Sequence, residues 1–149
     1  MSNARPPIGD SVVSEFKGSC HCGNVSYAVL GNIVSVVNCH CRLCRSLGGA
    51  AFASYVVVRQ AELSLQGKES LASYAATDKA TKHFCKICGT PIFNTNPVSY
   101  PSLVMLYLGT LASSPSITPK INIFCESKLS WVDGIASITG FPQAISRGA

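Results

Sequence analysis

Short stretches of β-branched and aromatic residues recur along the chain, and glycine, proline, asparagine or serine separates each from the next. This spacing is typical of short β-strands joined by turns. We therefore predict a mainly β protein, with strands over 25–30, 33–38, 51–58, 63–66, 71–75, 91–94, 103–108 and 121–124. Because no long window has helical periodicity, any helix should be short, following Cys44 or near residues 111–114.

Neither end of the chain shows this pattern. Residues 1–15 lack periodic apolar positions, so we predict a flexible N-terminal arm there, and a C-terminal tail over 142–149 for the same reason. Residues 16–141 remain as one predicted domain, because a chain of 149 residues is long enough to bury a single core.

Composition limits the kinds of protein that the chain can be. Hydrophobic residues make up 47% and charged residues 13%, which excludes a disordered chain and leaves room for a homodimer that covers an apolar face. The net charge of +5 comes from scattered lysines and arginines, which suits a small acidic ligand. A nucleic-acid site requires a dense basic stripe, so we expect no nucleic-acid partner.

The sequence also bears on location. The first ten residues lack the apolar core of a signal peptide, and the most apolar windows, 54–58 and 103–111, are too short to cross a bilayer. We therefore expect a cytoplasmic protein with no membrane partner. Because that compartment is reducing, its cysteines should be free or metal-bound.

Seven of the eight cysteines fall into three tight clusters, and only Cys125 stands alone. A secreted disulfide scaffold is the alternative to metal binding. Cys-x-Cys pairs are badly placed to bridge each other, and a reducing compartment disfavours such bonds, so we prefer metal ligation. The clusters are Cys20 and Cys22; Cys39, Cys41 and Cys44; and Cys85 and Cys88.

The first and third clusters look like two halves of one closed site. The two-residue gap between Cys85 and Cys88 lets both sulfurs reach one metal from a tight turn, and the glycine that follows can take a positive φ. Cys20 and Cys22 are one residue apart, which on an extended backbone puts both side chains on the same face. Four thiolates around zinc form a structural site that contributes to folding.

The middle cluster supplies only three thiolates. Zinc with three protein ligands keeps a fourth position for water or substrate, an arrangement suited to Lewis-acid catalysis or thiol capture. Arg42 and Arg45 add positive charge, which lowers the pKa of neighbouring thiols and attracts carboxylates. Gly48 and Gly49 would let the backbone approach a ligand closely.

A second interpretation of the middle cluster stays open. Cys125 or His40 could close it, which would make both zinc sites structural. We do not predict His21, His40 or His83 as ligands, because each lies close to a cysteine ligand and should point away from that metal. Arg42 and Arg45 could equally be solvated surface charges.

Three ordered motifs resemble the glutathione-dependent formaldehyde-activating enzyme family, which includes centromere protein V-like proteins. They are Gly-Ser-Cys-His-Cys-Gly at 18–23, Asn-Cys-His-Cys-Arg-Leu-Cys-Arg at 38–45 and Phe-Cys-Lys-Ile-Cys-Gly-Thr-Pro-Ile-Phe at 84–93. Ser-Lys-Leu-Ser-Trp at 127–131 is similar to a fourth family segment. In one departure, Asn122 stands where the family often has a histidine before Ile-Phe.

The resemblance implies a β-tent fold similar to the Mss4-like group, with several short antiparallel sheets. It also implies structural zinc on Cys20, Cys22, Cys85 and Cys88, and catalytic zinc on Cys39, Cys41 and Cys44. The family's founding activity is carbon–sulfur lyase chemistry, the reversible joining of glutathione and formaldehyde into S-hydroxymethylglutathione. We name four substrate-binding candidates, which are Arg42, Arg45, Asn122 and Trp131.

The predicted function is therefore a zinc-dependent carbon–sulfur lyase that acts on the aldehyde adduct of glutathione or another thiol. Two zinc ions per chain are expected, although a three-thiolate site can lose its metal on oxidation and be empty. The alternative is a non-catalytic zinc module that binds a thiol or a protein partner. No carboxylate lies in a motif that would identify a general acid or base.

Overall fold

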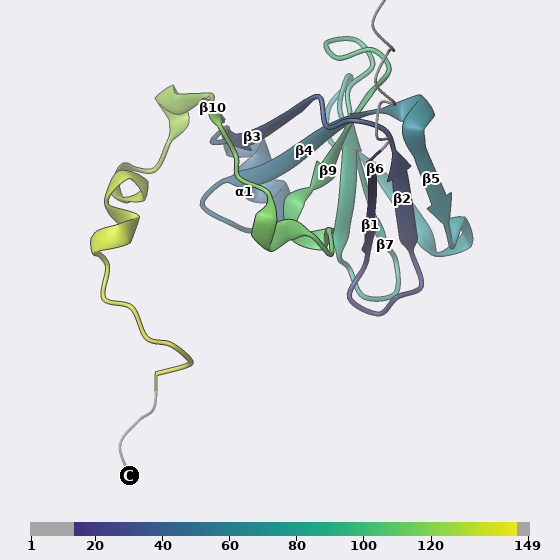
Figure 1. Cartoon of the computed structure of the whole chain (residues 1–149). Helices are drawn as coiled ribbons and strands as arrows, with labels where there is room; N and C mark the ends of the chain where they lie inside the picture. The colour runs from purple at the N-terminus through teal and green to yellow at the C-terminus, as the bar shows by residue number, and fades with distance from the viewer. Residues whose placement is uncertain (1–13, 146–149) are drawn as a thin grey trace, which may run out of the picture.

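Two β-sheets make up the body of the protein (Figure 1). The structure is a computed structural model and describes residues 14–145. The smaller sheet is antiparallel, in the order β1-β2-β5, with β1 at Glu15–Ser19, β2 at Ser26–Leu30 and β5 at Leu63–Gln66. The predicted mainly β architecture of short, largely antiparallel strands is thus confirmed.

The larger sheet has seven strands in the order β10-β3-β4-β9-β8-β7-β6. Only the pairing of β10 with β3 is parallel. Its strands are β3 at Ser35–Cys39, β4 at Ala53–Arg59, β6 at Leu71–Ala75, β7 at Thr81–Cys85, β8 at Pro91–Thr95, β9 at Leu103–Tyr107 and β10 at Ile121–Ile123.

One α-helix, α1 at Arg42–Gly48, follows β3. It contains Cys44, after which the sequence predicted a helix to begin, so the helix starts earlier than expected. Short 3-10 helices occupy Gln60–Glu62, Lys68–Ser70, Leu108–Thr110, Ser114–Ser116, Cys125–Ser127 and Ser130–Ser137. Within 14–145 no helix is long and apolar enough to cross a bilayer.

The main core lies between the two sheets. Val25 and Val29, before and within β2, pack against Val56 and Val58 of β4, and all four side chains are fully buried. Because side chains alternate across a strand, Tyr55 and Val57, the two neighbours of Val56, point to the opposite face of the large sheet. The apolar residues of β4 therefore lie on both faces of the large sheet. One face packs against the small sheet, and the other faces away from it.

Two strands, β1 and β7, were missed by the sequence analysis. Their sequences, Glu-Phe-Lys-Gly-Ser and Thr-Lys-His-Phe-Cys, contain too few apolar residues to stand out as strands. Both exist because a neighbouring strand supplies their hydrogen bonds, β2 for the first and β6 and β8 for the second. The residues of a short segment do not by themselves reveal whether a neighbouring strand will pair with it.

The predicted N-terminal arm and C-terminal tail can be compared with the structure only in part. Residues 1–13 of the predicted arm and 146–149 of the predicted tail lie outside the described residues, while Glu15 already belongs to β1. After β10 the chain runs away from the two sheets (Figure 1), and several apolar side chains there are exposed, including Trp131 and Phe141. The domain limits of 16–141 and the expected homodimer stay predictions.

Candidate metal centres and ligand pocket

The sulfur atoms of four cysteines converge between the two sheets. Those of Cys20, Cys22, Cys85 and Cys88 all lie within 4.8 Å of one another. The Sγ atoms of Cys20 and Cys22 are 3.5 Å apart, and those of Cys22 and Cys85 are 3.7 Å apart. Zinc–sulfur bonds of about 2.3 Å at tetrahedral angles separate sulfurs by about 3.8 Å, so this donor set fits a closed zinc site.

Two glycine-ended turns hold these cysteines. Gly23 N donates to Cys20 O at 3.1 Å and Gly89 N to Cys85 O at 2.8 Å, and the glycines have φ values of +80° and +76°. The positive φ predicted after Cys88 is confirmed. The extended backbone predicted from Cys20 to Cys22 is wrong, because the segment closes into a turn that brings the sulfurs together instead. A hydrogen bond with the Thr90 hydroxyl lowers the pKa of Cys88 to about 5.

The second cluster forms where β3 meets α1. Cys39 ends β3, Cys41 is the N-cap of α1 and Cys44 lies in its first turn, and their sulfurs lie within 4.8 Å of one another. Cys41 Sγ accepts a hydrogen bond from Cys44 N at 3.2 Å, as an N-cap side chain does. A hydrogen bond from the Cys44 thiol lowers the pKa of Cys39 to about 6, which favours the thiolate that a metal requires.

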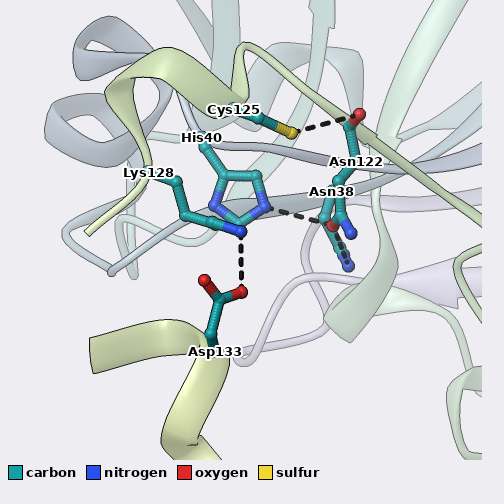
Figure 2. Close-up of polar contacts among 6 residues, drawn as sticks. All are labelled: Asn38, His40, Asn122, Cys125, Lys128 and Asp133. Carbon is teal, nitrogen blue, oxygen red and sulfur yellow. Dashed lines mark hydrogen bonds and ion pairs between the residues drawn. The ribbon is translucent and has the colours of Figure 1, made fainter. Parts of the chain in front are cut away.

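Neither side chain proposed to close this cluster does so. Among residues 14–145, no further cysteine, histidine or carboxylate has a ligand atom within that distance of the three sulfurs. Cys125 Sγ is 3.5 Å from the backbone oxygen of Asn122, and His40 Nε2 bonds the Asn122 side chain (Figure 2). The three-sulfur set therefore suits a metal that keeps an open position.

Asn122 belongs to a polar network with His40 and Asn38 (Figure 2). Its Oδ1 atom accepts hydrogen bonds from His40 Nε2 at 3.1 Å and from Asn38 Nδ2 at 3.2 Å. An amide oxygen only accepts, so His40 carries its proton on Nε2, and its buried Nδ1 has no partner among the described residues. Asn122 lines neither of the two hollows next to α1, so the structure does not bring it together with the other substrate-binding candidates.

A cavity of about 490 Å³ borders the three cysteines. Its floor is the face of the large sheet turned away from the main core, where Val37 of β3 pairs with Tyr55 of β4 and Val57 pairs with Met105 of β9. The β6–β7 turn, the segment after β8, and β10 with the following Phe124 supply the sides. No motif in the sequence pointed to this cavity.

Tyr55 gives the cavity a hydroxyl beside the cysteines. Its OH accepts a hydrogen bond from Asn94 Nδ2 at 2.9 Å, and Asn94 also donates to the Tyr107 OH at 3.3 Å. Tyr55 lines the cavity together with Cys44. Burial, and next the Cys44 sulfur, raises the pKa of Tyr55, so the phenol keeps its proton. Sequence reasoning missed Tyr55 and Asn94, and the only local signal was that Tyr55 alternates with Val56 and so faces away from the core.

A second hollow of about 440 Å³ lies on another side of α1. Arg42 and Arg45 line it together with Leu129 and Trp131, so three of the four substrate-binding candidates meet here. The Arg45 Nε atom is buried without a partner among the described residues, which leaves a donor ready for an anion. Gly49, predicted to approach a ligand, lines this groove and is the left-handed C-cap of α1.

The ion pair between Lys128 Nζ and Asp133 Oδ1, at 2.6 Å, joins the two sides of Trp131 along the chain (Figure 2). Lys128 belongs to the Ser-Lys-x-x-Trp segment and Asp133 to the 3-10 helix Ser130–Ser137. The Asp133 carboxylate raises the pKa of Lys128. This contact links the residues on either side of Trp131.

Fold and site together define a small β protein with a four-cysteine cluster and a three-cysteine cluster, the latter next to a cavity. Residues 15–127 match the sequence profile described as glutathione-dependent formaldehyde-activating enzyme. The chain belongs to this family. The match extends over the strands β1 to β10 and both cysteine clusters.

Individual relatives agree with this assignment. A Halomonas elongata protein, provisionally named a glutathione-dependent formaldehyde-activating enzyme, is 29% identical over 125 residues, 78% of this chain and 79% of that protein. An uncharacterised lyase of Schizosaccharomyces pombe is 27% identical over 79 residues, 53% of this chain and 56% of its own length. A crystal structure of a Rhodobacter sphaeroides protein superposes with a TM-score of 0.55 at 25% identity, covering 71% of this chain and 97% of that one.

Proposed function

We propose that the protein is a zinc-dependent carbon–sulfur lyase that forms and cleaves the adduct of a thiol with an aldehyde, with glutathione as the thiol. One observation carries the proposal: three cysteine sulfurs converge without a fourth protein ligand among the described residues, beside a cavity. The family and the lyase name of one relative support the same chemistry. A cytoplasmic location, which keeps thiols reduced, belongs to the proposal.

Each cluster has a separate role in this proposal. Cys20, Cys22, Cys85 and Cys88 would hold a structural zinc, because all four positions are filled and two of these side chains belong to the main core. Cys39, Cys41 and Cys44 would hold the second zinc, which when bound supplies Lewis acidity and stabilises a substrate thiolate at its open position.

The chemistry balances without a further reactant. The thiol sulfur attacks the aldehyde carbon, a sulfur–carbon bond forms, the carbon–oxygen double bond becomes single, and the thiol proton ends on the oxygen. The reverse reaction breaks the same bond and returns the proton to the sulfur. Tyr55 would donate a hydrogen bond to the oxygen as negative charge develops there, because Tyr55 lines the same cavity as the three cysteines and burial keeps its phenol protonated.

The hollow lined by Arg42 and Arg45, here named the arginine groove, would bind the peptide part of glutathione. Carboxylates are the ligands that a guanidinium binds best, and Arg42 and Arg45 lie on the helix that also carries Cys44. Trp131 would pack on the peptide backbone of the ligand from the other wall. The thiol of a ligand held in this way would extend toward the N-terminal end of α1, where the three sulfurs gather.

The test uses zinc-loaded protein and exchange NMR of glutathione with formaldehyde. We expect the protein to accelerate exchange between glutathione and S-hydroxymethylglutathione, and Tyr55→Phe to slow that exchange by about tenfold to a hundredfold, the loss typical of one oxyanion donor or somewhat less. Tyr74→Phe is the matched control, because Tyr74 is 58% exposed and lines neither hollow. Glutathione binding in a calorimeter without any acceleration would favour the non-catalytic module instead.

A further inference from the structure

The cavity extends well beyond the three cysteines. Cys39 and Ser35, the two ends of β3, both line it, and a rise of about 3.3 Å per residue separates them by roughly 13 Å. Val57 and Met105 lie level with Ser35 in the sheet register and also line the cavity. The cavity therefore runs from the three sulfurs at one end of β3 to Val57 and Met105 at the other end, and the described residues that line it along the way are uncharged.

No residue lining the cavity, among those the structure describes, is an aspartate, glutamate, lysine, arginine or histidine. Glutathione has two carboxylates and an ammonium group, and burying them here without partners is strongly unfavourable. Its charges suit the arginine groove instead. Formaldehyde has only two heavy atoms and would leave most of the 490 Å³ unfilled. Neither half of the family's founding adduct accounts for this space.

We propose that the cavity holds the carbon chain of an apolar aldehyde larger than formaldehyde. Its carbonyl oxygen lies at the Tyr55 hydroxyl, and its chain follows β3 toward Val57 and Met105. This inference rests on the proposed function, because it names the aldehyde half of the same adduct. The reaction is otherwise unchanged: the sulfur–carbon bond forms as the thiol proton moves to the carbonyl oxygen.

Asn94, which pairs with Met105 in the sheet register and donates to the Tyr55 hydroxyl, supports the placement of the adduct's oxygen. The residue is only 8% exposed, it lines the cavity, and its Oδ1 atom has no hydrogen-bond partner among the described residues. Buried acceptors without partners are rare in folded proteins. The hydroxyl of a thiol–aldehyde adduct is a donor that would satisfy it, while the Asn94 amide nitrogen keeps its bond to Tyr55.

A binding experiment tests the cavity without turnover. Met105 is one of two methionines in the chain, so methyl-labelled zinc-loaded protein gives few signals, and the Met105 signal reports on the aliphatic wall. We expect octan-1-ol to shift the Met105 methyl resonance saturably. Affinity should rise from propan-1-ol to octan-1-ol by up to about fourfold per added methylene.

A kinetic experiment then uses propanal and octanal with glutathione, two linear aldehydes of similar carbonyl reactivity. We expect a kcat/KM at least thirtyfold higher for octanal. Ala80→Trp should lower the octanal-to-propanal ratio at least tenfold, because Ala80 lines the cavity from the β6–β7 turn. Ala76→Trp should narrow the cavity from the same turn, and this variant replaces Ala80→Trp if that protein does not fold. Ala61→Trp, exposed and outside the cavity, should leave the ratio unchanged.

The outcomes separate the two proposals. A Met105 shift together with a chain-length preference supports both. A Met105 shift with no turnover of any aldehyde supports the apolar ligand and overturns the lyase proposal. Turnover of formaldehyde with no preference for octanal, and no Met105 shift, overturns the apolar aldehyde and leaves the lyase proposal standing.

Discussion

The Nε2 atom of His40 donates to the Oδ1 atom of Asn122 across a distance of 3.1 Å, joining the end of β3 to β10. His40 is 2% exposed and lies between Cys39 and Cys41, yet its ring is held away from them by this bond. The parallel pairing of β10 with β3 brings the two residues together. Asn122 thus gives the His40 ring a hydrogen-bond partner outside the three-cysteine cluster.

The first prediction concerns this bond. Asn122→Ala should lower the free energy of unfolding by about 1–3 kcal/mol, because the buried His40 Nε2–H loses its acceptor. Asn122→Asp keeps an oxygen acceptor and should cost less. Denaturant melts of the zinc-loaded proteins measure both changes. Equal losses for alanine and aspartate would argue against the hydrogen bond as the cause.

The second prediction separates the two cysteine clusters. Cys85→Ala should unfold or aggregate the protein, because a structural zinc contributes folding free energy directly and Cys85 lies in the main core. Cys41→Ala should leave a folded chain with about one zinc instead of two. Cys125→Ala is the control, since this exposed thiol lies in neither cluster and should keep both metals.

Metal analysis measures the zinc content of these three variants, and circular dichroism measures whether they are folded. Unfolding of similar extent in Cys41→Ala and Cys85→Ala would mean that both sites are structural. In that case the open-site chemistry would lose its basis.

The third prediction concerns glutathione. Arg45→Ala should weaken binding of glutathione by about tenfold or more, because a charge-assisted bond to a carboxylate contributes about 1.5–3 kcal/mol. Arg59→Ala is the matched control: Arg59 pairs with Glu62 at 3.3 Å and lines neither hollow next to α1. Calorimetry at two salt concentrations gives both affinities. If Arg59→Ala weakens binding as much as Arg45→Ala does, general charge rather than the groove attracts the ligand.

The fourth prediction is a pH dependence. Burial raises the pKa of Tyr27 from 10.0 to about 12, so its phenol favours folding below pH 10 and loses that contribution as the pH rises through 12. By pH 12 the wild type should lose about 2 kcal/mol of unfolding free energy that Tyr27→Phe does not lose. Subtracting the unfolding free energy of Tyr27→Phe from that of the wild type at each pH removes the contribution of the other tyrosines, which both proteins share. Parallel pH profiles would contradict the assigned cause.

Much of the architecture was readable from local sequence. Each of the eight predicted strands overlaps an observed one, because β-branched runs between turn residues are a local signal. The division of seven cysteines into two groups also followed from spacing, since Cys-x-x-Cys and Cys-x-Cys turns are short-range features. The convergence of the 20–22 pair with the 85–88 pair required the inference that two half-sites complete each other.

Tertiary structure alone decided the rest. Tyr55 and Asn94 become neighbours because β9 pairs with both β4 and β8, and β4 is distant in sequence from the other two strands. No local pattern encodes that register. The same register determines which apolar residues face the core and which line the cavity. The sequence by itself thus specified eight of the ten described strands and the grouping of seven cysteines into two clusters. The surroundings of the open cluster depend on long-range pairing, because only side chains brought together across strands can form a cavity.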